Sequence, residues 1–178
     1  MARVLAVSSQ VVRGHVGLSA IVPALQRLGH EVWPVPTVLL SNHPGHARFT
    51  VVRLSADDIG RMLDTLDASG WLDGVDAVLT GYLPSQDHVR VAVAAVERLK
   101  ARRAVTFLCD PVLGDEPKGV YIDAGAARAI RDALLPLADI ATPNRFELGW
   151  LTGAPVGSLA EVEAVARSLV PKRVVVTS

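Results

Sequence analysis

Short apolar runs alternate along the chain with longer segments in which apolar residues recur at helical spacing. The short runs are rich in β-branched residues and predict strands at residues 4–7, 31–39, 77–80, 105–109, 139–141 and 173–177. The longer segments predict helices at residues 17–28, 55–69, 85–103, 124–135, 145–151 and 158–169. Such alternation is typical of repeated βαβ units, so the sequence predicts an α/β fold with a mostly parallel central sheet.

Capping residues support several of these helix starts. Ser55 stands three residues before Asp58, and Ser158 stands three residues before Glu161, which is close to the capping-box pattern. In that pattern a hydroxyl accepts a hydrogen bond from a backbone N–H in the first helical turn. The starts of the second and last predicted helices are therefore well supported.

Length, charge and cysteine content narrow the possible classes of protein. No internal repeat or Pro/Gly/Ser linker divides the chain, so residues 1–178 are expected to form a single domain. Lys plus Arg and Asp plus Glu number 18 each, so neither nucleic acid nor an anionic membrane is an expected partner. Cys109 is the only cysteine, which fits a reducing cytoplasm. No apolar run reaches the length of a membrane span, and the N-terminal run is too short for a signal peptide.

An acidic motif follows the predicted strand at 105–109, where a parallel sheet presents its ligands. Asp110 emerges from the strand, Pro111 stiffens the exit, and Gly114 lets the chain turn. Mg²⁺ is commonly held by one or two carboxylates together with substrate phosphates, so the motif predicts cation and phosphate chemistry. The alternative is a capped turn that binds nothing.

A second motif combines a strand exit with a helix start at residues 142–147. Asn144 is a good N-cap and Glu147 occupies the third helical position, so local capping alone is sufficient to explain both residues. Their coincidence with Asp110 at another strand exit favours a shared metal and nucleotide site.

Polar or aromatic residues also follow two other predicted strands. Ser9 belongs to a Ser-Ser-Gln segment after the strand at 4–7, where a ligand contact and a plain helix entry are both possible. After the strand at 77–80, Gly81 permits close backbone approach, and Tyr82 offers a ring on which a small aromatic ligand would stack. The alternative is that Tyr82 only covers the edge of the core.

Together these segments resemble the pyridoxal kinases of the ribokinase-like superfamily. The matching segments are Ser9 with 11–12, 14–17, 32–34, 41–43, 81–83, 110–112, 142–144 with 146–148, and 176–178. The resemblance implies a three-layer α/β/α fold and transfer of the ATP γ-phosphate to the 5′-hydroxymethyl group of pyridoxal, pyridoxine or pyridoxamine. It also implies Mg²⁺, often a monovalent cation, and a homodimer in the cytoplasm.

The resemblance further implies roles for individual residues. Ser9 would hydrogen-bond the substituents of the pyridine ring, while His43 and Tyr82 would line the vitamin pocket. Asp110 and Glu147 would act on the metal ion and the phosphates, directly or through water. The residues expected along the ATP are Asp110, Thr142, Asn144, Glu147, Thr177 and Ser178.

The chain departs from the family pattern at three positions near the expected vitamin pocket. Gln10 stands where the family often has His, and Leu18 stands where it often has Asn. Pro44 replaces the usual Thr after His43, which removes a hydroxyl and an N–H. Because an unpaired buried polar group costs about 1–3 kcal/mol, a weaker affinity for the vitamin is expected.

Members of this family continue past the Thr-Ser strand to a Gly-x-Gly-Asp motif, whose Asp is the general base and whose helix N-terminus forms an anion hole. The 178 residues contain no such motif, so they are expected to match the N-terminal portion of the family fold, without a catalytic base of their own. Low turnover is expected from them alone, since acid–base and electrostatic contributions are each worth about 10²-fold or more.

Two alternatives remain open. The first is a hydroxymethylpyrimidine kinase, whose pocket also takes a small heteroaromatic alcohol, although His43 and the segment 32–34 favour the pyridoxal branch. The second is a non-catalytic, truncated relative that binds the vitamin or another subunit.

Overall fold

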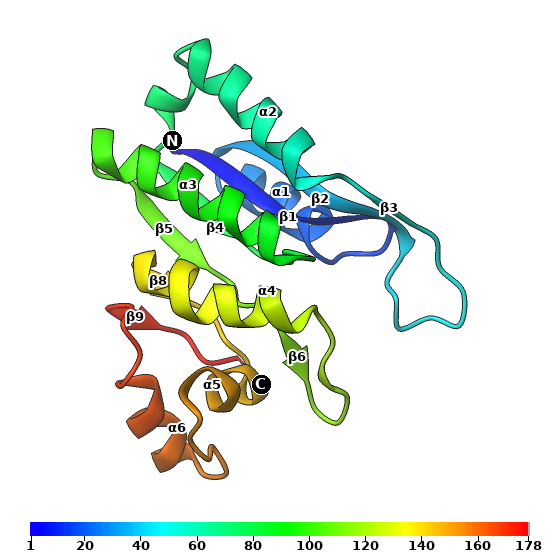
Figure 1. Cartoon of the computed structure of the whole chain (residues 1–178), viewed down its shortest axis with the longest axis vertical. Coiled ribbons are helices and arrows are strands. Elements are labelled where there is room, and N and C mark those ends of the chain that lie inside the picture. The colour runs from blue at the N-terminus through cyan, green and yellow to red at the C-terminus, as the bar shows by residue number, and fades with distance from the viewer. Residues whose placement is uncertain (178) are drawn as a thin grey trace.

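A seven-stranded sheet forms the centre of residues 1–177, the part of the chain that the computed structural model describes (Figure 1). The strand order is β3-β2-β1-β4-β5-β8-β9, and each neighbouring pair is parallel except β2 with β3. These strands are β1 Arg3–Arg13, β2 Glu31–Asn42, β3 Val51–Arg53, β4 Ala77–Thr80, β5 Thr106–Cys109, β8 Ile140–Ala141 and β9 Arg173–Val174. A separate antiparallel pair is formed by β6 Gly114–Asp115 and β7 Gly119–Val120.

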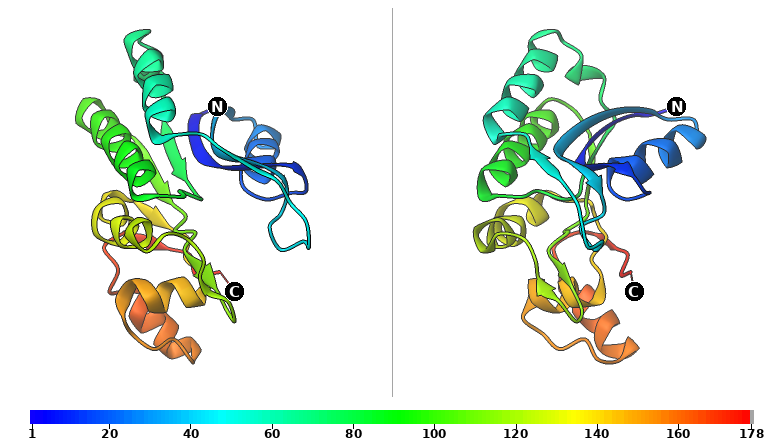
Figure 2. Two further views of the ribbon diagram at one scale, coloured as in Figure 1. Left: turned by 45° about the vertical axis from the view of Figure 1, so that its right-hand side comes forward. Right: turned by 90° about the vertical axis from the view of Figure 1, so that its right-hand side faces the viewer.

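Helices cover both faces of the sheet. The helices are α1 Leu18–Arg27, α2 Ala56–Ala68, α3 Gln86–Arg102, α4 Ala124–Ala129, α5 Arg145–Thr152 and α6 Leu159–Ala166. Figure 2 shows α2, α3 and α4 side by side on one face and α1 on the opposite face. The predicted α/β fold with a mostly parallel sheet is therefore confirmed.

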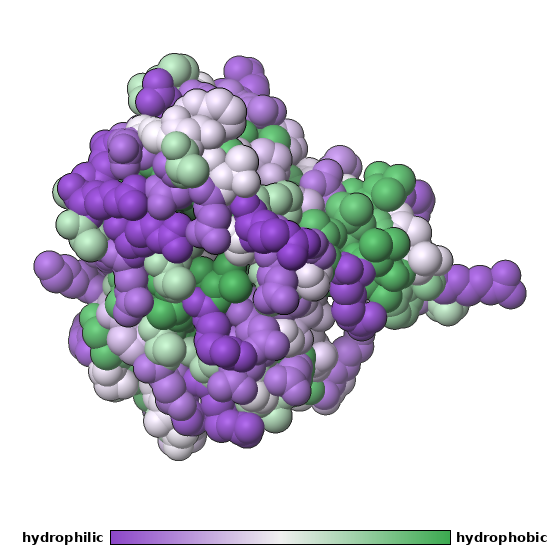
Figure 3. All heavy atoms as spheres, turned by 45° about the horizontal axis from the view of Figure 1, so that its top comes forward, coloured by the Kyte–Doolittle hydropathy of each residue, from purple (hydrophilic) through white to green (hydrophobic). Residues whose placement is uncertain are grey.

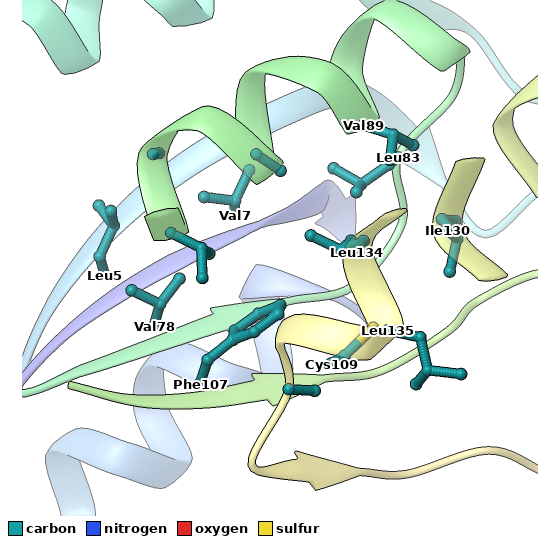
Figure 4. Packing of buried hydrophobic residues seen from close by; sticks show 14 of the residues in the cluster. Leu5, Val7, Val78, Leu83, Val89, Phe107, Cys109, Ile130, Leu134 and Leu135 are labelled. Carbon is teal, nitrogen blue, oxygen red and sulfur yellow. The ribbon is translucent and has the colours of Figure 1, made fainter. Parts of the chain in front are cut away.

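The main hydrophobic core lies between the sheet and the α2–α3–α4 layer (Figure 4). Phe107 and Cys109 of β5 are fully buried there, facing side chains such as Val89 of α3. Burial raises the pKa of the Cys109 thiol to about 12, so the thiol stays protonated, as expected for an inert core residue. A smaller cluster beneath α1 contains Leu18 and Val32.

The ends of β1 and β2 together with β3 form an arm that extends from one end of the sheet (Figure 1). Its inner face packs Val11, Val38 and Leu40 against Tyr82. Apolar side chains also gather on the outer surface of this arm, at the right of Figure 3. Those with large exposed fractions are Val12 (87%), Leu39 (41%) and Val52 (58%).

The first strand is longer than the sequence pattern predicts. Residues 8–10 were expected to follow the strand at 4–7, but β1 continues through them to Arg13 because β2 pairs with it as far as Asn42. The register shifts between Ser8 and Gln10, where one residue of β1 faces two of β2, which is the geometry of a β-bulge. Ser9 therefore lies within the strand, at the bulge.

Three short strands were missed by the pattern analysis: β3, β6 and β7. Each spans two or three residues, too few for an alternating pattern to be recognised. The loop that joins β2 to β3 spans residues 43–50, since Ser41 and Asn42 still belong to β2.

The predicted helix at 124–135 is correct only in its first part. After α4 the backbone passes through a π-helical segment, η2 Ile130–Leu134, and a 3-10 turn, η3 Leu135–Leu137. Pro136 lies in that turn, and its missing N–H cannot continue an α-helical ladder. A further 3-10 turn, η1 Leu72–Gly74, precedes β4.

The predicted helix caps are confirmed. Ser55 accepts a hydrogen bond from the Asp58 N–H at 3.1 Å, and Ser158 forms a complete capping box with Glu161. Among the described residues, none of the helices combines the length and the apolar character needed to cross a membrane.

Candidate functional site

The parallel strands β1, β4, β5 and β8 bring their carboxyl ends to one edge of the sheet. Ser9 lies in β1 just beyond the residues that pair with β4, and Tyr82, Asp110 and Thr142 follow the ends of β4, β5 and β8. Sequence positions that are more than 130 residues apart thus meet at a single edge. In open α/β sheets this edge is where ligands bind.

Asp110 and Thr142 are joined directly. The Thr142 hydroxyl donates a hydrogen bond to Asp110 Oδ1 at 2.9 Å. Burial raises the pKa of the Asp110 carboxyl above its usual value, while the bond from Thr142 opposes this shift. A carboxylate destabilised in this way gains from a nearby cation.

Glu147 is the most buried carboxylate of the site, with 4% of its surface exposed. Its Oε1 accepts the Leu113 N–H at 2.9 Å, and its Oε2 accepts the Asn144 N–H at 2.8 Å. Burial raises the pKa of Glu147 to about 7, the charge of Asp110 adds to the rise, and the backbone donors reduce it. Both oxygens are thus engaged by backbone, so Glu147 holds the segment after β5 against the start of α5.

Asn144 joins three parts of the site. Its Oδ1 accepts the Glu147 N–H at 2.8 Å, which completes the predicted capping box of α5. Its Nδ2 donates to Gly114 O at 2.9 Å, and its backbone forms a parallel bridge with Thr177. Thr177 is thereby placed beside Asn144, whereas Ser178 lies outside the described residues.

Tyr82 is half-buried between the main core and the inner face of the arm. Burial raises the pKa of its phenol, and the charge of Arg53 on β3 lowers it. The Ser9 carbonyl and hydroxyl lie close to Gly17, where a Cβ would stand 2.2 Å and 2.6 Å from those two oxygens. Gly17 therefore leaves the space that Ser9 needs.

His43 lies apart from the Asp110 group. It belongs to the exposed loop between β2 and β3, and its Nδ1 accepts the Gly45 N–H at 3.1 Å. Pro44, the departure from the family pattern, is exposed in the same loop. The structure brings together Asp110, Thr142, Asn144, Glu147 and Thr177, but it does not bring His43 into that group.

Tyr121, which follows β7, was not singled out from the sequence. Its pKa is raised to about 12 by burial and by the negative charges of Glu147, Asp115 and Asp110. The charges of these carboxylates therefore act on the Tyr121 phenol, which follows the β6–β7 hairpin and keeps half of its surface exposed. In the sequence, this hairpin was indicated only by two glycines, Gly114 and Gly119, at the start of its two strands.

No group of three or more His, Cys, Asp or Glu side chains within residues 1–177 is placed to hold a metal ion. Mg²⁺ is often bound by one or two carboxylates with phosphate and water oxygens completing the shell. Asp110, together with Glu147, fits a metal site that carboxylates share with phosphate and water oxygens. The two residues do not fit a metal site built from protein ligands alone.

Comparisons with known proteins identify the family to which this chain is similar. The family model of phosphomethylpyrimidine kinase matches residues 17–177. The pyridoxal kinase PdxY of Corynebacterium diphtheriae is 41% identical over 179 residues, covering 98% of this chain and 63% of that protein. The chain therefore spans just under two thirds of the length of this curated relative.

Solved structures show the same fold. Pyridoxal kinase from Leishmania donovani in complex with ADP and pyridoxamine gives a TM-score of 0.87 at 34% identity, covering 94% of this chain and 58% of that one. A putative phosphomethylpyrimidine kinase from Bacteroides thetaiotaomicron gives a TM-score of 0.90 at 28% identity, covering 99% and 62%. These matches confirm the resemblance and the fold expected from the sequence.

Proposed function

The chain belongs to the phosphomethylpyrimidine kinase family, and from this premise we propose that it serves ATP-dependent phosphorylation of pyridoxal, pyridoxine or pyridoxamine. The observation that carries the proposal is the joining of Asp110 to Thr142, with Asn144 and Thr177 alongside, at the ligand-binding edge of the sheet. The names of the relatives and the ligands in the Leishmania structure support it.

We place the vitamin near the carboxyl ends of β1 and β4. Ser9 would hydrogen-bond the ring substituents, and Tyr82 would present its ring as one wall of the pocket. His43 would reach this pocket through movement of the β2–β3 loop, since it lies apart from the Asp110 group in this structure. A ligand-contacting loop of this kind is common on α/β scaffolds.

We place the nucleotide phosphates between the ends of β5 and β8. Asp110 would bind Mg²⁺ together with phosphate oxygens, and Thr142 and Asn144 would contact the phosphates with Thr177 and Ser178 further along the ATP. Glu147 would act on the metal ion through water, because its own oxygens accept backbone N–H groups. A monovalent cation would share the oxygens of Asp110 and Thr142. Catalysis here is mainly positioning and charge neutralisation.

Ligand binding tests the proposal directly. We expect calorimetric titration of the chain to detect both pyridoxine and Mg²⁺–ADP. Asp110→Asn should weaken Mg²⁺–ADP binding about tenfold, as expected for loss of a charged contact, and leave pyridoxine binding unchanged. A chain that binds neither ligand would refute the proposal. Phosphorylation of pyridoxal at an ordinary kinase rate would contradict the low turnover expected from residues 1–178 alone.

A hydroxymethylpyrimidine kinase activity is the second candidate. The description of the matching family model and the Bacteroides structure favour it. Both substrates are small heteroaromatic alcohols, so the same pocket would accept either. Competition between pyridoxine and hydroxymethylpyrimidine for the chain should separate them, because the preferred alcohol displaces the other at lower concentration.

We also propose a homodimer that works in the cytoplasm. The apolar outer surface of the arm, where Val12, Leu39 and Val52 are exposed, supports self-association. The buried Cys109 thiol suits a reducing compartment.

A further inference from the structure

The backbone of Tyr82 is held by two side-chain hydroxyls from neighbouring strands. The Ser8 hydroxyl of β1 accepts the Tyr82 N–H at 3.1 Å. The Thr37 hydroxyl of β2 donates to the Tyr82 carbonyl oxygen at 2.8 Å. Both backbone polar groups of Tyr82 are therefore fixed by residues far away in sequence.

The β-bulge and a glycine make these contacts possible. Thr37 lies in the irregular stretch of β2 where the register with β1 shifts, and a bulge re-aims the side chains at that point. Gly81 allows the contact between the Ser8 hydroxyl and the Tyr82 N–H, because a Cβ at position 81 would lie 2.4 Å from Ser8 Oγ. The register shift between β1 and β2 and the glycine that follows β4 thus both act at Tyr82.

Both hydroxyls act in a dry environment. Thr37 is fully buried and Ser8 is 2% exposed, so loss of either hydroxyl leaves a partly buried backbone group of Tyr82 without its partner. Thr80, two residues before Tyr82, is a natural contrast. Its Oγ1 is buried and makes no hydrogen bond to a nitrogen or oxygen atom among the described residues, although it lies close enough to the Cys109 thiol to lower the pKa of that group. Two of these three buried hydroxyls are thus committed to Tyr82.

We propose that Ser8 and Thr37 are positioning residues for the ligand pocket, holding the Tyr82 ring at the height and angle at which it receives the heteroaromatic substrate. The proposal rests on the proposed function, which places Tyr82 in the vitamin pocket. Neither hydroxyl needs to touch the substrate. They act on substrate affinity indirectly, by holding the backbone that carries the Tyr82 ring.

The first test observes Tyr82 without any ligand. The chain has two tyrosines, so fluorotyrosine incorporated into a Tyr121→Phe background reports on Tyr82 alone. We expect Thr37→Val to shift and broaden the fluorine NMR signal, because the ring then samples several positions. Thr37→Ser, which keeps the hydroxyl, and Thr80→Val, which removes a buried hydroxyl that does not bond Tyr82, should leave the signal unchanged.

The second test measures pyridoxine binding by calorimetry with Tyr121 intact. We expect Thr37→Val and Ser8→Ala to raise the dissociation constant about tenfold, while Thr37→Ser and Thr80→Val change it less than about twofold. Mg²⁺–ADP binding should be the same in all four variants, which excludes general unfolding as the cause.

The two tests separate the possible failures. If the fluorine signal and the pyridoxine affinity of Thr37→Val match those of Thr80→Val, the positioning role is wrong. If the signal changes while pyridoxine binds as before, the hydroxyls hold Tyr82 but Tyr82 is not part of the vitamin pocket, and the positioning proposal is again overturned. If the unmodified chain binds no pyridoxine, the proposed function fails, and the proposal about substrate affinity fails with it.

Discussion

Burial and hydrogen bonding shift the pKa of the Glu147 side chain in opposite directions. Its carboxylate accepts two backbone N–H groups, yet burial still raises its pKa from 4.5 to about 7. A raised pKa means that the folded protein holds this proton more tightly than the unfolded chain does. The stability contributed by the protonated form is therefore full below about pH 4.5 and is lost as the pH rises through about 7.

Replacing Glu147 with Gln should remove this pH dependence. We expect the unfolding free energy of the unmodified protein to fall by about 3 kcal/mol between pH 4.5 and 7.5 from this group, and the Glu147→Gln protein to lose that slope. Denaturant unfolding monitored at several pH values measures it. Glu161→Gln is the matched control. Glu161 closes the capping box of α6 on the surface and its pKa is lowered, so this change should leave the slope between pH 4.5 and 7.5 in place. Equal slopes in the unmodified and Glu147→Gln proteins would contradict the expectation.

Single site residues were predictable where their chemistry is visible at a strand exit. Asp110, Thr142 and Asn144 each follow an apolar strand, and the structure joins them as neighbours. Thr37 and Tyr121 were not predictable in this way. Thr37 depends on a one-residue register shift between β1 and β2, and Tyr121 depends on a hairpin of two-residue strands. Register is set by pairing between distant segments, which a local pattern does not contain.

Two helices of this protein start with the same capping motif but in different surroundings. Asn144 caps α5 and also donates to Gly114 O, whereas Ser158 caps α6 alone. We expect Ser158→Ala to lower the unfolding free energy by about 1 kcal/mol and Asn144→Ala by about 2–3 kcal/mol, since the second change also leaves a partly buried carbonyl unpaired. Thermal or denaturant unfolding of the two variants measures the difference.

Asn144→Asp separates the two roles of this residue. The aspartate keeps the oxygen that caps α5 but loses the N–H donor to Gly114. An intermediate loss of stability is therefore expected, with weaker Mg²⁺–ADP binding if the nucleotide lies where we propose. Equal stability of Asn144→Ala and Ser158→Ala would show that the Gly114 contact contributes nothing.

Most helices and the central strands could be predicted from the spacing of apolar residues, because their apolar faces cover a continuous core. The ends did not: the helix predicted at 158–169 stops at Ala166, and the strand predicted at 173–177 is regular only over Arg173–Val174. Near these ends fewer side chains are buried, so the pattern carries less information about where an element stops.

At the scale of the whole molecule, α1 covers only part of its face of the sheet. It shields the first half of β1 and β2, where Ala6 and Val32 are buried, while the continuation of that sheet onto the arm leaves Leu39 and Val52 exposed. Leu39 and Val52 are direct cross-strand partners in the β2–β3 ladder. β3 is also the edge strand of the sheet, and an exposed edge beside apolar side chains favours association between chains.

Sedimentation of the Val52→Glu protein tests whether this surface makes the proposed homodimer. A charge at the centre of a dry contact should cost enough to shift the population to monomer at micromolar concentration, since a buried unpaired charge is strongly unfavourable. Val170→Glu is the matched control, because Val170 is similarly exposed (68% against 58%) but lies after α6, beyond the arm. The expectation requires an unmodified dimer, a monomeric Val52→Glu protein and a dimeric Val170→Glu protein. If all three proteins are dimers, the dimer contact lies on another surface. If the unmodified protein is a monomer, the proposed homodimer is wrong.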